Sequence, residues 1–337
     1  EQYNILEKNM KFNKETKIYL PSSLLLFSYM LTGITTFISD VDLNKVEEIK
    51  YENIIKQINE NNIQNIVLPS VIFENTADYA LRKNIIFKNV QTAYVTGTYV
   101  FPKVLEKIRK VFINAQVKWV YGVPGAELIS VLDFEEITEE DLESMKKGKG
   151  LLAGKKVNEM ESEIKKPEKE ISEESNGENL KSIDRENEAD KSTEEIGEIW
   201  VRRDYILKEN SDTDENKKWY GTGNSGYINN KGQLVLLGKV GKEINIKGKK
   251  YYPLAVETAF SFCKAVRKSA LISKDGNLYL VFERNPEFKG SPETDGEMEK
   301  LKEKFGIFKI IEGNVYVNKN FNSETDYKKT EETVEKV

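Results

Sequence analysis

The chain has 337 residues, of which 39% are hydrophobic and 32% are charged, so it is long enough to bury the core of two or three structural units. Its formal net charge of -5 argues against a nucleic-acid partner, which would require a basic face. The chain has no His and a single Cys, Cys263, which excludes internal disulfides, His-ligated zinc and Ser-His-Asp or Cys-His catalytic pairs, and which favours a reducing cytoplasm.

The sequence begins at Glu1 without an initiator Met, as a fragment would, and shows no signal-peptide pattern. An uncharged run at residues 18–39 is long enough to span a bilayer. Pro21, Gly33 and a pair of Thr residues weaken a membrane helix there, and β-branched residues dominate the second half. We therefore expect a buried helix leading into a buried strand. Membrane attachment through residues 19–38 is the alternative.

Residues 41–150 alternate short apolar runs with stretches of helical spacing, which is typical of an α/β fold. The expected helices are residues 51–63 and 102–112, and the expected strands are residues 65–71, 90–100 and 116–122. The second helix opens with Pro102 and puts Val104, Leu105, Ile108 and Val111 on one face. The order of elements predicts a parallel crossover.

Residues 155–195 are rich in Glu, Lys, Ser and Asn and poor in aromatic residues, so we expect most of this segment to be a disordered insertion. Order is expected to return with a strand at residues 196–203. Residues 226–239 predict a hairpin around an Asn-Asn-Lys-Gly turn.

After Gly238 the pattern indicates a small α+β unit, with a possible hinge at residues 239–242. The expected elements are a helix at residues 256–264, strands at 268–274 and 277–283, a charged helix near 295–305 and a last strand at 314–317.

Six segments resemble, in order and with sensible spacing, the motifs of the adenylate-forming superfamily, which includes acyl-CoA synthetases, peptide-synthetase adenylation domains and luciferases. They are most similar to its fatty-acyl and olefin β-lactone synthetase branch. The segments are residues 94–112, 119–130, 147–157, 197–202, 219–260 and 320–329. Each motif alone is weak, because Gly-rich turns between strands are common.

The resemblance implies the carboxyl-terminal part of an adenylate-forming fold: a truncated large α/β domain followed by a small, mobile α+β domain. The implied divisions are a partial AMP-binding domain at residues 1–154, the insertion at 155–195, the β-rich end of the large domain at 196–238 and the small domain at 239–337. The implied reaction joins a carboxylic or fatty acid to ATP with Mg²⁺, and then passes the acyl group to CoA or a carrier-protein thiol. The small domain rotates between the two steps.

The resemblance also carries over expected nucleotide-binding positions. Gly97, Thr98 and Tyr99 match the adenine loop, and Tyr121 and Gly122 match a Tyr-Gly motif. Asn224 stands where the family has an Asp that grips the ribose, and Lys239 stands where an Arg is usual. Read without the resemblance, the two Tyr residues are core aromatics and the Gly residues mark tight turns.

Two catalytic positions depart from the family pattern. Glu324 matches the Lys that promotes adenylation, so the charge is reversed there, and Lys328 or Lys329 would replace it only after a slip in register. Gly125 matches the Glu that positions Mg²⁺ and supplies no ligand, although Glu127 lies two residues on. The family's phosphate-binding loop has no match and would precede Glu1.

Two hypotheses follow. In the first, the chain is an acyl-activating ligase of fatty acid metabolism, similar to an acyl-CoA synthetase and completed by a separate N-terminal half or a longer polypeptide. In the second, it is a pseudoenzyme, a catalytically dead relative that works as a nucleotide-binding, acyl-binding or protein-interaction module.

Overall fold

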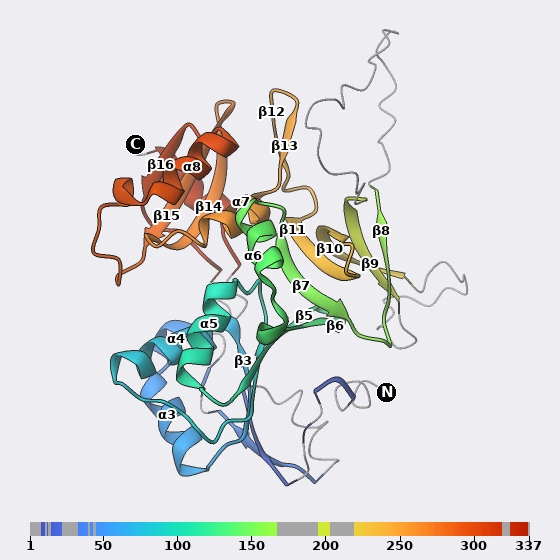
Figure 1. The fold of residues 1–337 in the computed structure, drawn as a ribbon, viewed down its shortest axis with the longest axis vertical. Helices are drawn as coiled ribbons and strands as arrows, with labels where there is room; N and C mark the ends of the chain where they lie inside the picture. The colour runs from blue at the N-terminus through green and yellow to red at the C-terminus, as the bar shows by residue number, and fades with distance from the viewer. Residues whose placement is uncertain are drawn as a thin grey trace.

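A long mixed sheet runs through the larger part of the molecule (Figure 1). The computed structural model describes residues 8–10, 12, 15–21, 33–39, 41–42, 45–166, 195–202, 219–318 and 324–335. Within these ranges the sheet has eleven strands. Their spatial order is β2 (Thr35–Ile38), β1 (Lys17–Leu20), β3 (Asn65–Pro69), β4 (Thr92–Thr96), β5 (Gln116–Val123), β6 (Ala126–Asp133), β7 (Leu151–Lys156), β11 (Gln233–Lys239), β10 (Trp219–Ile228), β9 (Gly197–Arg202) and β8 (Glu161–Lys165).

The strands from β2 to β5 are parallel, and three helices cover one face of this half: α3 (Tyr51–Glu60), α4 (Ser70–Arg82) and α5 (Pro102–Val111). The expected helix at residues 102–112 and the parallel crossover are confirmed. All four predicted apolar residues of α5 are buried, because one face of that helix packs on the sheet. The strand expected at residues 65–71 ends earlier, at Pro69, where α4 begins.

The segment at residues 18–39 differs from the expectation. Its beginning is the strand β1, in which Ile18, Tyr19 and Leu20 are fully buried. This strand stands where the expected helix was to begin, and residues 22–32 lie outside the described residues. The expected buried strand is wrong for β2, since this strand lies at the edge of the sheet with Thr35 and Ile38 exposed. Among the described helices, none has the length and apolar character needed to cross a membrane.

The expected disordered insertion is wrong for its first residues. Residues 155 and 156 complete β7, and β8 pairs antiparallel with β9, where Ile164 lies opposite the buried Ile199. An edge strand tolerates the charged residues that suggested disorder, because one of its sides faces solvent. Residues 167–194 lie outside the described part of the chain. The antiparallel hairpin of β10 and β11 is confirmed.

The smaller unit contains the sheet β14 (Val266–Lys274), β15 (Asn277–Arg284) and β16 (Lys309–Glu312), with the helices α7 (Pro253–Phe260), α8 (Gly296–Phe305) and α9 (Tyr327–Glu335). A short hairpin, β12 (Ile244–Ile246) and β13 (Lys249–Tyr251), precedes it. The predicted β14–β15 hairpin and α8 are confirmed. The helix expected at residues 256–264 begins and ends earlier. The last strand expected at residues 314–317 is wrong, because β16 at residues 309–312 pairs with β15 instead.

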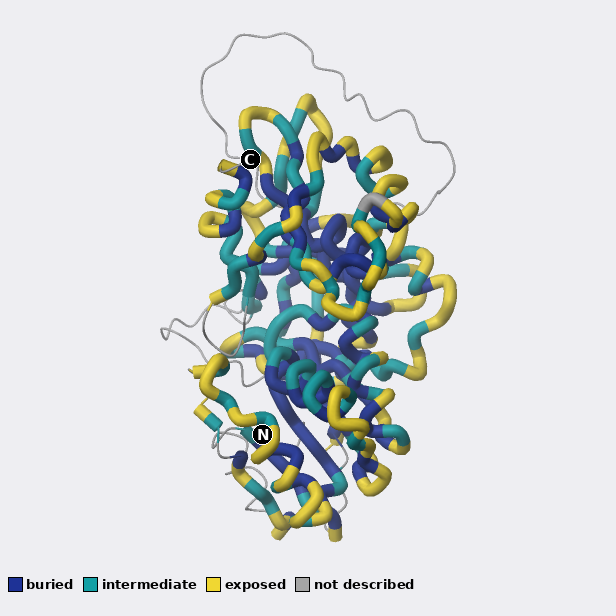
Figure 2. Tube along the Cα trace, turned by 90° about the vertical axis from the view of Figure 1, so that its left-hand side faces the viewer, coloured by how far each residue is buried: buried dark blue, intermediate teal, exposed yellow. Residues whose placement is uncertain are grey.

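Helix α7 connects the two cores. Its eight residues are all buried: Leu254 and Ala255 pack in the core of the large sheet, whereas Val256, Ala259 and Phe260 pack in that of the smaller unit. In Figure 2 buried segments run through both parts and exposed residues gather at the turns. The shared helix fixes the smaller unit against β11 and β7 of the large sheet.

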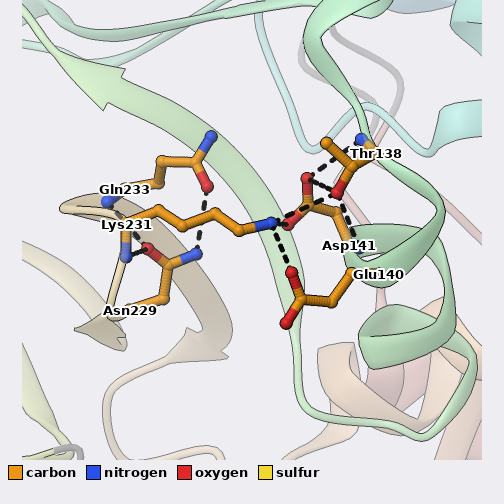
Figure 3. Close-up of polar contacts among 6 residues, drawn as sticks. All are labelled: Thr138, Glu140, Asp141, Asn229, Lys231 and Gln233. Atoms are coloured by element: carbon orange, nitrogen blue, oxygen red, sulfur yellow. Dashed lines mark hydrogen bonds and ion pairs between the residues drawn. The ribbon is translucent and has the colours of Figure 1, made fainter.

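A polar cluster holds α6 (Glu139–Lys146) against the β10–β11 turn (Figure 3). Thr138 and Asp141 form a capping box, in which each side chain accepts a hydrogen bond from the other residue's backbone N–H. The Nζ of Lys231, from the turn, lies 2.8 Å from Asp141 Oδ1 and 2.9 Å from Glu140 Oε2. The cap therefore fixes both the start of the helix and its position on the sheet.

Candidate functional site

A cavity of about 230 Å³ lies at the junction of the two units. Its walls come from the segments that follow the parallel strands β3 and β4, from the end of β11, from α7 and from residues 324–327 of the smaller unit. Ligand sites in α/β proteins lie at the carboxyl ends of parallel strands. This cavity is therefore the candidate functional site.

Beside the cavity, a buried hydrogen-bond network joins three of the expected site residues. The Tyr99 hydroxyl donates to Asn224 Oδ1 at 2.6 Å, and Asn224 Nδ2 donates to the Tyr121 hydroxyl at 2.9 Å. Asn224 Nδ2 also donates to the carbonyl of Thr222 at 3.2 Å. Asn224 is 1% exposed and Tyr121 is 3% exposed. Burial raises the pKa of both tyrosines, so their hydroxyls are neutral.

This network uses the groups that the resemblance assigned to a nucleotide. The acceptor of the Asn224 amide is occupied by Tyr99, and its donor is occupied by Tyr121 and Thr222. The Tyr121 ring packs edge to face on Trp119, with centroids 6.0 Å apart. Of the expected nucleotide-binding residues, Thr98, Tyr99 and Lys239 line the cavity, whereas Gly97, Tyr121, Gly122 and Asn224 do not. The expected residues therefore fall into two groups, one on the cavity wall and one in the buried network beside it, and their role in nucleotide binding stays a prediction.

Glu324 reaches the cavity from the smaller unit. Its carboxylate lies 3.2 Å from Lys239 Nζ, and each side chain is about 40% exposed (40% and 39%). The backbone holds this segment in place, since Asn318 N–H donates to the Glu324 carbonyl at 2.9 Å. Lys239 pairs in register with Asn224 across β11 and β10. The structure thus brings Glu324, Lys239 and the Asn224 network together.

Gly125 and Gly122 lie at the tip of the β5–β6 hairpin and within β5. Gly125 has φ +88°, and the Tyr220 hydroxyl donates to the neighbouring Pro124 carbonyl at 2.8 Å. A Cβ at Gly122 would lie 1.9 Å from the carbonyl oxygen of Glu127, so the close approach of β6 requires glycine. Glu127 is exposed and does not line the cavity.

Magnesium, which the sequence resemblance implies, does not fit these residues. Gly125 supplies no carboxylate, and the described residues contain no group of three or more His, Cys, Asp or Glu side chains that could hold a metal ion. The basic and acidic side chains of the cavity wall are instead distributed over different elements.

Sequence reasoning missed Glu257, which lies on α7 and lines the cavity. It is 3% exposed, and its carboxylate accepts from Leu271 N–H at 3.0 Å and from the Tyr327 hydroxyl at 3.1 Å. Burial raises the pKa of Glu257 to about 7. The sequence signal was a single acidic residue inside the apolar helix at residues 253–260.

Lys103 was also missed, although it lies in a helix that was predicted. Its Nζ donates to the Val266 carbonyl at 2.6 Å and so links α5 to β14. Burial lowers the pKa of Lys103 to about 8. Nothing in the spacing of α5 distinguishes this lysine from a surface lysine, because its partner is distant in the sequence.

Comparisons with known proteins support the fold. No protein-family model and no curated protein matches the chain. The amide bond synthetase McbA from Marinactinospora thermotolerans is similar with a TM-score of 0.72 and 15% identity, over 98% of this chain and 63% of that one. O-succinylbenzoate coenzyme A synthetase (MenE) from Bacillus subtilis, in complex with ATP and magnesium, gives a TM-score of 0.65 and 17% identity, over 98% of this chain and 64% of MenE.

A third structure, McyG A-PCP complexed with phenylalanyl-adenylate, gives a TM-score of 0.59 and 15% identity over 99% of this chain and 63% of that chain. The chain therefore has the mixed α/β fold of these enzymes and spans less than two thirds of their length. Membership of the adenylate-forming superfamily, and the branch within it, stays a prediction.

Proposed function

We propose that this chain is a relative of the adenylate-forming ligases that has kept their fold but lost the adenylation step, and that it acts as a small-molecule binding module. The observation that carries the proposal is the ion pair of 3.2 Å between Glu324 and Lys239 at the cavity. Acyl adenylation builds negative charge on a phosphoryl group and expels pyrophosphate, so it requires fixed positive charge at the reacting atoms.

The charge at Glu324 opposes that chemistry. Two unit charges about 4 Å apart interact by roughly 4 kcal/mol at an effective dielectric constant of about 20. Replacing a lysine by a glutamate next to an anionic transition state therefore costs at most about 8 kcal/mol, which is on the order of a 10⁶-fold loss of rate, and solvent screening of these half-exposed groups reduces that upper bound. Glu324 also neutralises Lys239, which is the cation at the end of β11.

Two further positions support the same conclusion. Gly125 offers no ligand for Mg²⁺, and the polar atoms of the Asn224 amide are occupied by Tyr99, Tyr121 and Thr222.

The single cysteine is not a nucleophile, because burial raises the pKa of the Cys263 thiol to about 12. A free buried thiol accords with a cytoplasmic location, which remains part of the proposal.

The second candidate is an active acyl-activating ligase, which the fold likeness favours. It would use ATP, Mg²⁺ and a carboxylic or fatty acid, and would pass the acyl group to CoA or a carrier-protein thiol. A separate N-terminal half would act as a partner in this case.

Pyrophosphate release by the chain alone tests whether the chain is active without a separate N-terminal half. The purified chain is mixed with ATP, Mg²⁺ and a panel of fatty acids, with and without CoA, and pyrophosphate is measured with a coupled enzyme assay. We expect release at the level of a control without protein, and we expect Glu324→Gln, which removes the negative charge, to release no less than wild type. Sustained, acid-dependent release by the wild-type chain would refute the proposal.

A further inference from the structure

The last three strands of the large sheet, β10, β9 and β8, carry two tryptophans on one face. Buried and half-buried residues alternate along β9, so Glu198, Trp200 and Arg202 point away from the core. The cross-strand register puts Trp219 of β10 opposite Arg202, and Glu163 of β8 opposite Trp200. The two tryptophans are therefore diagonal neighbours on the outer face of the sheet.

The ammonium group of Lys165, from the end of β8, lies against both aromatic rings. Its Nζ is 4.1 Å from the centroid of the Trp200 ring and 5.5 Å from that of the Trp219 ring. The same Nζ lies 2.9 Å from Glu163 Oε1. Indole faces attract cations within about 6 Å of the ring centroid, and pairs of aromatic rings bind ammonium groups in this way. Trp200, Trp219 and Glu163 thus form an aromatic cage that already holds one ammonium group.

The Trp200 ring is oriented by contacts of its own. Glu198 accepts from Trp200 Nε1 at 2.9 Å through Oε2, and from the Gly223 N–H at 3.0 Å through Oε1. A Cβ at Gly221, which lies opposite Trp200, would be 3.2 Å from the indole ring and 2.8 Å from Glu198 Oε1, so glycine leaves room for the ring. The contacts that orient the indole therefore come from β9 and β10 rather than from Lys165.

Carboxylates outnumber cations on this face, and more so once Lys165 leaves the cage. The charged side chains that β8 and β9 place there are Glu161, Glu163 and Glu198 against Lys165 and Arg202. Arg202 pairs with Glu161, and its guanidinium lies 5.1 Å from the centroid of the Trp219 ring. Glu163 and Lys165 are 41% and 40% exposed, so solvent reaches the cage. A dissolved cation therefore has access to the cage and is favoured there by charge.

The resident ammonium of Lys165 is a primary one, which water hydrates strongly. A quaternary ammonium ion is hydrated more weakly and is the cation that aromatic cages recognise. We propose that Trp200, Trp219 and Glu163 form a binding site for a small quaternary ammonium ion, which enters by displacing the Lys165 side chain. None of these three described residues lines the cavity between the two units, so the inference is independent of the proposed function.

Choline and its uncharged analogue 3,3-dimethylbutan-1-ol test the ligand class, because they have the same shape and differ in charge. Tryptophan fluorescence follows binding, since two of the three tryptophans form the cage and Trp119 is fully buried in β5. We expect a saturable change with choline and none with the alcohol. An equal response to both, or no response of the wild-type chain to choline, would overturn the proposal.

Two matched lysine variants test the displacement. Lys165→Met removes the resident ammonium group, and Lys166→Met removes the same charge from the next residue, which pairs with Glu195 instead. We expect Lys165→Met to tighten choline binding by at least about fivefold, because the tethered competitor is gone, and Lys166→Met to stay within about twofold of wild type. Equal changes in the two variants would mean that only net charge matters, and this would overturn the site.

Two substitutions made in the Lys165→Met background test the cage itself, because no lysine then competes with the ligand. We expect Trp200→Leu to abolish saturable choline binding and Glu163→Gln to weaken it by at least about threefold. Circular dichroism checks that both proteins are folded, and Glu163→Gln, a change at a half-exposed side chain, decides alone if Trp200→Leu is not. Unchanged affinity in either folded variant would overturn the assignment.

Discussion

Asn224 is buried among neutral hydrogen-bond partners, so an aspartate at this position would lower the stability of the folded chain. Its Nδ2 donates to the Thr222 carbonyl, so a carboxylate would bring a negative charge against a carbonyl oxygen. Burying an ionised group with an imperfect set of partners costs free energy. The local structure thus favours the amide over the aspartate that the adenylate-forming motif contains.

We expect Asn224→Asp to lower the free energy of unfolding by about 2 kcal/mol at neutral pH, and by less in acid, where the carboxyl is protonated. Urea denaturation at both pH values measures this difference. Tyr220→Phe, which removes the hydroxyl at the exposed β5–β6 turn, is the control for a lost polar contact near the surface. Unchanged stability in Asn224→Asp would show that the network is not closed as described.

The free energy of unfolding is expected to depend on pH because of the buried carboxyl group of Glu257. Its folded pKa of about 7 lies above the ordinary value of 4.5, so the folded chain binds this proton more tightly than the unfolded chain does. The stabilisation is fully present below about pH 4.5 and is lost as the pH rises to about 7. Its total is on the order of 3 kcal/mol.

We therefore expect Glu257→Gln to flatten the fall in unfolding free energy between about pH 5 and about pH 7. Urea denaturation of wild type and variant across this range measures the slopes. Glu332→Gln, on the exposed side of α9, is the matched control and should keep the wild-type slope. Parallel slopes for wild type and Glu257→Gln would contradict the assignment.

Elements with a strong local pattern could be predicted from the sequence, and those that depend on distant partners could not. The spacing of apolar residues located α5, and Asp275-Gly276 located the β14–β15 turn, because both signals are local. β8 was missed because its charged residues resemble a disordered segment until β9 pairs with them. β16 was misplaced because helix α8 separates it in the sequence from its partner strand β15.

The capping box of α6 is expected to stabilise the first turn of this helix. We expect Thr138→Ala to lower the free energy of unfolding by about 1 kcal/mol, since the first turn of the helix loses its side-chain acceptor and Asp141 loses a partner. Thermal or urea denaturation measures the loss. Glu143→Ala, which removes an exposed ion pair with Lys146, should leave stability nearly unchanged, because solvent screens such a pair. Equal effects would argue against the cap.

At the scale of the whole molecule, contacts between the two units build the candidate site. Lys103 links α5 to β14, Glu324 pairs with Lys239, and α7 belongs to both cores. The resemblance of the sequence motifs, taken in order, predicted that Tyr99, Asn224, Lys239 and Glu324 would lie near one site. The same order could not reveal the contacts of Lys103 and Glu257, because their partners are distant in the sequence.

The central claim is that the carboxylate of Glu324 reduces the positive charge of the cavity. Calorimetric affinities for pyrophosphate, used as an anionic probe, of wild type, Glu324→Gln and Glu324→Lys, measured at one salt concentration, test it most directly. We expect affinity to increase in that order, by about three- to tenfold for each unit of charge, since these half-exposed groups are partly screened by solvent. Equal affinities for the three proteins, or weaker binding by Glu324→Lys, would contradict the claim.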